Sequence, residues 1–125
     1  VESDILVSHA SANPLTTLKP VITADQMLQL RSLVSKIYVA PSIDTYIVNL
    51  AEATRQNSSS GNGVSTRALL MLKRAARATA ALAGRDYVTP DDIHRLLPLV
   101  FPHRMFGSSK VGEAVIEEII QQVAV

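Results

Sequence analysis

The stretch GVSTRALLMLKRAARATAALAGRDYVTPDDI, residues 63–93, decides the fold of this 125-residue chain. It predicts one long helix from about Ser65 to Gly84, because alanine and leucine favour the helix and glycine commonly ends one in a left-handed conformation. It then predicts a second helix at Thr89 and Pro90, since threonine caps a helix and proline suits its first position. Two helices joined by a short turn therefore form the centre of the domain.

The sequence before this stretch predicts two more helices and almost nothing with the period of a strand. Thr23 and Gln26 can form a capping box, and the helix that follows reaches about Ile37 with one apolar face expected to pack. Ser42 is expected to cap the next helix, which runs to about Arg55. These helices add to the bundle that residues 63–93 begin.

The two ends of the chain are less regular in sequence. Residues 1–10 predict a short amphipathic turn or two, and the helix from Pro90 is expected to end near Leu97, because Pro98 follows. A last helix from about Val111 carries an apolar face. That face consists of Val115, Ile116, Ile119, Ile120 and Val123.

Composition limits the classes of function. A formal net charge of +1 gives no broad basic field, so binding to nucleic acid is not expected. There is no cysteine, hence no disulfide framework and no thiolate nucleophile. No apolar run approaches the roughly 18 residues that span a membrane, and the amino terminus does not have the pattern of a signal peptide. We expect a single domain cut from a longer chain.

No motif of an independent enzyme is present. The glycine-rich segment SGNGVST lacks the lysine of a phosphate-binding P-loop. His9, His94 and His103 are too far apart in sequence for local metal-ligand spacing, so no metal site is expected; His94 is expected on the exposed side of its helix. The feature that needs a reason is Arg67, since an arginine in a helix's first turn opposes the dipole and therefore indicates an anion or a partner.

Three segments in order, ILVSH, YIVNLAEATR and the stretch from GVSTR to FPHRM, resemble the carboxy-terminal lid of the MoxR family of AAA+ ATPases. The resemblance extends over nearly all of the chain, although Thr66 stands where a proline is frequent. It implies an all-α fold, a small bundle of about five to six helices of the AAA+ lid type. It also implies that residues 1–125 form a single lid domain and that the P-loop core domain lies outside this chain.

The resemblance assigns roles as well. Arg67 would be the second sensor, with Ser65 and Arg55 as further residues at the nucleotide, and residues 57–63 would be a mobile loop that lets the lid swing. The full-length protein would use ATP and Mg²⁺ in a ring of six subunits in the cytoplasm. The lid's partners would be its own core and neighbouring subunits, in a chaperone-like motor often accompanied by a von Willebrand factor A domain protein. Whether Arg67 acts in cis or in trans stays open.

Other interpretations of the same residues remain. Arg67 could pair with a carboxylate such as Glu52, at a gain of about 0 to 1 kcal/mol. Lys73, Arg74 and Arg77 could be a solvated face, a domain interface or a surface for phosphates. The motif RDYVTPDDI after a long helix is also similar to histone-fold modules that bind DNA or protein, and a stand-alone helical adaptor without an ATPase core is a third alternative.

Overall fold

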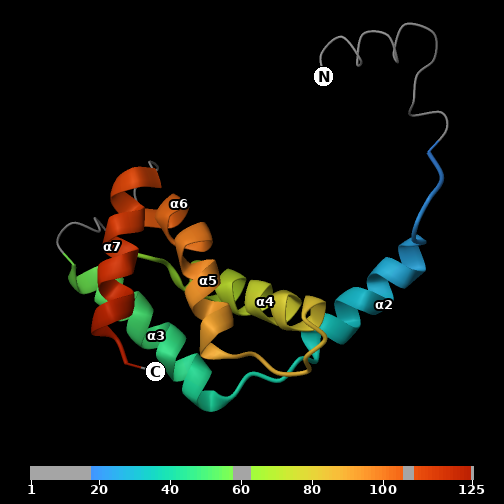
Figure 1. The fold of residues 1–125 in the computed structure, drawn as a ribbon, viewed down its shortest axis with the longest axis horizontal. Helices are drawn as coiled ribbons and strands as arrows, with labels where there is room; N and C mark the ends of the chain where they lie inside the picture. The colour runs from blue at the N-terminus through green and yellow to red at the C-terminus, as the bar shows by residue number, and fades with distance from the viewer. Residues whose placement is uncertain (1–17, 58–62, 106–108, 125) are drawn as a thin grey trace, which may run out of the picture. The chain divides into compact units, whose positions relative to one another are not determined.

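The computed structural model describes residues 18–57, 63–105 and 109–124 (Figure 1). By its internal contacts the chain divides into residues 1–30 and residues 31–125, and the core lies in the second part. The predicted turn at residues 1–10 and the middle of the predicted loop, residues 58–62, lie outside the described residues. Within the described ranges the structure is helical, which confirms the all-α prediction.

Helix α2, Ala24–Ser35, begins at the predicted capping box. The Thr23 N–H donates to Gln26 Oε1 at 2.9 Å, and the Gln26 N–H donates to Thr23 Oγ1 at 3.2 Å. The prediction that α2 packs along one face is wrong, since none of its residues is buried and Met27 and Leu30 are about half exposed. Local capping therefore sets where α2 begins.

Helix α3, Pro41–Gln56, buries Tyr46, Ile47 and Leu50 on one face. Its start differs from the prediction, because Pro41 takes the first helical position and Ser42 does not cap. Proline suits that position, since its missing N–H would have no partner within the helix. Two backbone hydrogen bonds place the segment before α3: Tyr38 N–H donates to Asp86 O at 2.8 Å, and Val88 N–H to Tyr38 O at 3.0 Å.

Helix α4, Thr66–Leu82, packs most extensively against α5, Pro90–Val100. The buried residues of α4 recur at every fourth position, and most are alanines that let the neighbouring helices approach closely. They are Ala68, Leu72, Ala76 and Ala80. Gly84 follows with a φ of +71°, which confirms the predicted left-handed stop.

Helix α5 begins with Thr89 as cap and Pro90 in its first turn, as predicted. The prediction that α5 ends near Leu97 is wrong, because Pro98 lies inside the helix. This proline lacks the N–H for one bond near the helix end, yet the bond of the C-cap residue, from Phe101 N–H to Leu97 O, is kept at 3.0 Å.

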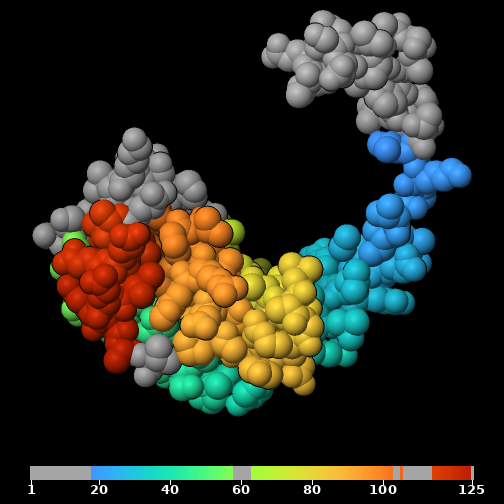
Figure 2. Space-filling model, viewed as in Figure 1, coloured from blue at the N-terminus to red at the C-terminus, as the bar shows by residue number. Residues whose placement is uncertain are grey.

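Two helices complete the fold: α6, Pro102–Met105, and α7, Ser109–Gln122. Helix α7 contacts α3, α5 and α6, and buries Val115, Ile116 and Ile119 as the sequence predicted. Helices α7, α5 and α4 lie in that order across one face of the bundle (Figure 2). No described helix has the length and apolarity that crossing a membrane requires.

Candidate functional site

The start of α4 carries the predicted sensor, Arg67. Arg67 is the second residue of the helix and its side chain is exposed. Its predicted alternative partner, Glu52, does not pair with it, since the ion pairs among the described residues are formed by Lys73 with Asp44 and by Arg85 with Asp92. The structure therefore leaves the Arg67 guanidinium directed to solvent rather than used within the described part of the bundle.

The first turn of α4 has little stabilisation of its own. Ser65 is the N-cap residue, but its side chain makes no capping hydrogen bond, and the first turn contains no acidic residue. The amide N–H groups at a helix start have no partner inside the helix and carry the positive end of the dipole. An exposed arginine, a hydroxyl that does not cap the helix and these N–H groups together favour an anion at this end of α4.

Two residues at the end of α3 hold the residue before this turn. The Thr54 hydroxyl accepts a hydrogen bond from the Val64 N–H at 3.1 Å. The Arg55 guanidinium donates to the Val64 carbonyl oxygen through Nε at 3.2 Å and through Nη2 at 3.1 Å. Both polar backbone groups of Val64 are thus bonded to α3. We refer to Thr54, Arg55 and Val64 as the α3–α4 clamp.

Gly63 allows the chain to pass close to α3 at the clamp. Its φ is +64°, and a Cβ atom built on it would lie 2.6 Å from Arg55 Cγ and 2.8 Å from Arg55 Cα. Any side chain here would meet both an unfavourable backbone conformation and the backbone of Arg55. The glycine of the GVSTR motif is therefore required by the close approach of these two segments.

Of the predicted nucleotide residues, the structure places Ser65 and Arg67 together at the start of α4. Arg55 lies in the last turn of α3, and two of its guanidinium nitrogens are used on Val64. Sequence reasoning missed Thr54. The sequence shows only that a threonine directly precedes Arg55; the full burial of Thr54, which requires a partner for its hydroxyl, is visible only in the structure.

The basic residues farther along α4 do not form one cluster. Lys73 bonds to Asp44 of α3, with Nζ 2.7 Å from Oδ1 and 2.8 Å from Oδ2, so it links α3 to α4. Arg74 is exposed, and Arg77 is half-buried, with its Nε enclosed and without a hydrogen-bond partner among the described atoms. Arg74, seven residues after Arg67, lies on nearly the same side of the helix.

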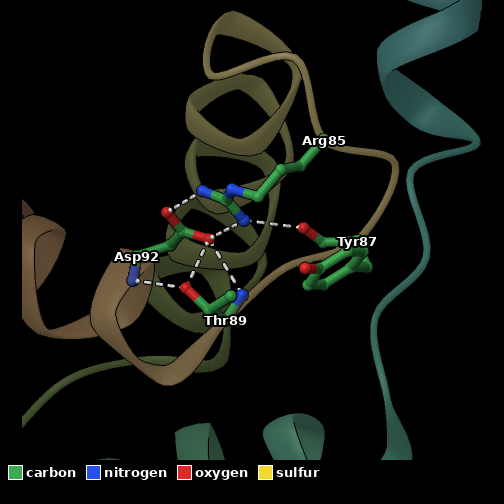
Figure 3. A network of polar contacts seen from close by, with 4 residues as sticks. All are labelled: Arg85, Tyr87, Thr89 and Asp92. Carbon is green, nitrogen blue, oxygen red and sulfur yellow. Dashed lines mark hydrogen bonds and ion pairs between the residues drawn. The ribbon is translucent and has the colours of Figure 1, made fainter.

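A second polar network closes the opposite end of α4 (Figure 3). Arg85, just after the helix, donates to both carboxylate oxygens of Asp92 and to the carbonyl oxygen of Tyr87. Asp92 also accepts from the Thr89 N–H at 2.8 Å, which completes a capping box at the start of α5. The Arg85 hydrogen bonds lower the pKa of the Asp92 carboxyl despite its burial, and the Thr89 bonds act in the same direction.

His94 differs from its prediction. It is half-buried, and its Nε2 lies 2.6 Å from the hydroxyl oxygen of the buried Tyr46. The two rings meet edge to face, with centroids 5.7 Å apart, and join α5 to α3. Burial raises the pKa of Tyr46, so this hydroxyl stays protonated. His103 lies where no side chain is described, and across the described ranges no group of three His, Asp or Glu side chains could hold a metal ion.

Comparisons with known proteins show the family of the chain. Residues 52–124 match the AAA lid domain family. The chain is 38% identical to the uncharacterized protein YeaC of Bacillus subtilis, over 99% of this chain and 41% of YeaC. It is 30% identical to the chaperone MoxR1 of Mycobacterium tuberculosis, over 85% of this chain and 32% of MoxR1.

The fold of this chain is also found in a solved structure. A protein of Cytophaga hutchinsonii, provisionally described as an ATPase, matches with a TM-score of 0.80 and 27% identity, over 98% of this chain and 42% of that protein. The chain thus spans about two fifths of the length of that protein and of YeaC, and less of MoxR1.

Proposed function

Since this chain belongs to the AAA lid domain family, as a lid of the MoxR type, we propose that it completes the ATP site of its full-length protein with Arg67 as the second sensor. The observation that carries the proposal is the exposed Arg67 in a first turn that is neither capped nor acidic. Lys73 and Arg85 each form an ion pair with an aspartate, whereas Arg67 forms no ion pair with a described residue.

The residues at the start of α4 fit a phosphate group. The guanidinium of Arg67 is permanently charged and offers forked donors that match phosphate oxygens. The N–H groups of Thr66 and Arg67, which precede the first backbone hydrogen bond of α4 from Ala68 N–H to Ser65 O, and the Ser65 hydroxyl add donors on the same side. Residues outside this chain would bind most of the ATP and its Mg²⁺, and ATP would supply the phosphoryl group for hydrolysis. Arg67 would stabilise negative charge on that group and report its presence to the lid.

The remaining parts of the proposal concern the full-length protein. The lid works with its own AAA+ core domain and with neighbouring subunits in a ring of six. Arg67 acts either on the nucleotide of its own subunit or on that of a neighbouring subunit. Its motion couples ATP hydrolysis to a chaperone-like task, with a von Willebrand factor A domain protein as a further partner, in the cytoplasm. The support for this part is the similarity to proteins named MoxR and to the chaperone MoxR1.

The test is steady-state ATP hydrolysis by the full-length protein, with wild type compared with Arg67→Ala. Loss of a charge-stabilising donor predicts a fall in kcat of about 10² to 10³, with ATP binding and ring assembly largely kept. Arg67→Lys keeps the charge but loses the fork, so its kcat is expected between the two. Arg95→Ala, an exposed arginine of α5, is the matched control and should leave kcat unchanged. Equal turnover in wild type and Arg67→Ala would refute the sensor role.

A further inference from the structure

Helix α4 differs from α2 and α5 in how its start is held. Thr23 with Gln26 and Thr89 with Asp92 form reciprocal capping boxes at α2 and α5. Helix α3 has no side-chain cap either, but Pro41 and the acidic Asp44 stand in its first turn. At α4 the side chain of Ser65 makes no such bond. First turns without caps fray easily, because their N–H groups are unpaired and an arginine there opposes the dipole. Some other contact must therefore fix the first turn of α4.

The α3–α4 clamp supplies that contact. Val64 directly precedes the N-cap residue, and its N–H and its carbonyl oxygen are bonded to Thr54 and Arg55. Its side chain is only 1% exposed, so the core holds the side chain while the clamp holds the backbone. Val64 is therefore fixed on all sides, three residues before Arg67.

We propose that Thr54 and Arg55 are positioning residues for Arg67, holding Val64 so that the first turn of α4 presents the guanidinium at a fixed place. This inference rests on the proposed role of Arg67 as sensor. Neither Thr54 nor Arg55 has to touch the nucleotide for it, because they act through the Val64 backbone. Val64 directly precedes the N-cap residue Ser65, so a shift of its backbone displaces the start of the turn that carries Arg67.

Thr54 is suited to this task by its own bonding. Its side chain is fully buried, and its hydroxyl donates to the Ala51 carbonyl oxygen at 2.6 Å. With its proton used there, the oxygen is left as an acceptor for the Val64 N–H. Valine has nearly the same shape as threonine but can neither donate to Ala51 nor accept from Val64. Thr54→Val therefore removes the hydrogen bond that holds Val64 and keeps the branched shape of the side chain.

The test is a double-mutant cycle in the full-length protein, with kcat for ATP hydrolysis and ATP affinity measured for wild type, Thr54→Val, Arg67→Ala and the double variant. A displacement of about 1 Å in a positioned group can cost up to about 10²-fold, so we expect Thr54→Val to lower kcat by roughly 10-fold to 100-fold. ATP affinity should change less than about 3-fold, since the phosphate-sensing step is affected more than binding.

Coupling separates positioning from general stability. If Thr54 acts through Arg67, adding Thr54→Val to Arg67→Ala lowers kcat by less than about 2-fold further. Independent, multiplying losses would overturn the inference and leave the sensor role intact. A normal kcat in Arg67→Ala would overturn the sensor role and this inference together. The two failures are therefore distinguishable.

Conservative and matched variants complete the experiment. Thr54→Ser keeps the hydroxyl and should restore kcat to within about 3-fold of wild type, whereas a loss equal to that of Thr54→Val would contradict the clamp. Thr45→Val makes the same change on α3 at an exposed hydroxyl bonded to Pro41 O, and should have no effect. If Thr54→Val does not fold, Arg55→Lys takes its place in the cycle, because lysine cannot donate from two nitrogens to one carbonyl.

Discussion

Arg85 and Asp92 face each other with their charged groups aligned: Nη2 lies 2.7 Å from Oδ1, and Nη1 lies 2.9 Å from Oδ2. Asp92 is buried, and it also holds the backbone of Thr89. One carboxylate thus joins the residue after the Gly84 stop to the first turn of α5. The angle between α4 and α5 is consequently set by this pair as well as by the alanine face between the helices.

Asp92→Asn is expected to lower the free energy of unfolding at pH 7 by about 1 to 3 kcal/mol, because charge-assisted bonds within a nearly buried group are lost. Asp91→Asn is the matched control. Asp91 stands beside Asp92 in the same first turn but is exposed, so only its interaction with the dipole, about 0.3 to 1 kcal/mol, is lost. Urea unfolding followed by circular dichroism measures both. Equal losses in the two variants would show that the Arg85 pair adds nothing.

The stability that Asp92 contributes should depend on pH in a defined range. Its pKa in the folded chain lies below the unfolded value, about 3.9, because Arg85 and Thr89 bond to the charged form. The contribution is therefore complete above about pH 4 to 5 and is lost as the pH falls through the lowered folded value. The difference in unfolding free energy between wild type and Asp92→Asn should be constant from pH 7 to pH 5 and shrink below pH 4. A constant difference down to pH 2 would contradict this origin.

Tyr46→Phe should cost about 0.5 to 1.5 kcal/mol of unfolding free energy, since it removes the hydroxyl that lies 2.6 Å from His94 Nε2 in a buried contact between α3 and α5. Tyr38→Phe removes a hydroxyl from a side chain that is 61% exposed, and should be nearly neutral. Thermal unfolding of the two variants side by side measures the difference. Equal melting temperatures of the two variants would mean that the hydrogen bond between Tyr46 and His94 adds no net stability over the bonds that the hydroxyl makes to water in the unfolded chain.

Gly63→Ala and Gly84→Ala form a matched pair, because both glycines have a positive φ, +64° and +71°. At Gly84 a Cβ atom meets nothing within 4 Å, so the cost is the left-handed backbone alone, about 1 to 2 kcal/mol. At Gly63 the Cβ atom would also overlap Arg55, and the loss should be clearly larger. Denaturant unfolding measures both free energies. A smaller loss at position 63 would show that the chain there moves away from α3 at little cost.

Features set by neighbouring residues could be predicted from the sequence. The Thr89 and Thr23 caps and the Gly84 stop depend on residues within a few positions, so local rules located them. Pro98 shows where such rules fail, because a helix with a well-packed buried face tolerates one missing bond near its end. The apolar residues of α2 recur at helical spacing, yet none of them is buried. Such a pattern indicates that a face prefers burial, but it does not identify the segment that would bury it.

The candidate site was predictable to a similar extent. The sequence predicted that Arg67 lies in the first turn of a helix, and the structure places it there. The partners of Thr54 and His94 did not follow, since each lies on another segment of the chain, 10 residues from Thr54 and 48 residues from His94. Such contacts depend on how α3 meets α4 and α5, which no local pattern specifies.

The α3–α4 clamp also bears on how the length of this domain can vary. Thr54 and Arg55 precede the connection between α3 and α4, and Val64 follows it, so the place where α4 begins does not depend on the number of residues between 57 and 63. Closing a loop of twice the length costs only about 0.6 kcal/mol more. Insertions can therefore accumulate in this connection, and sequences that differ in length there can keep Arg67 in one place.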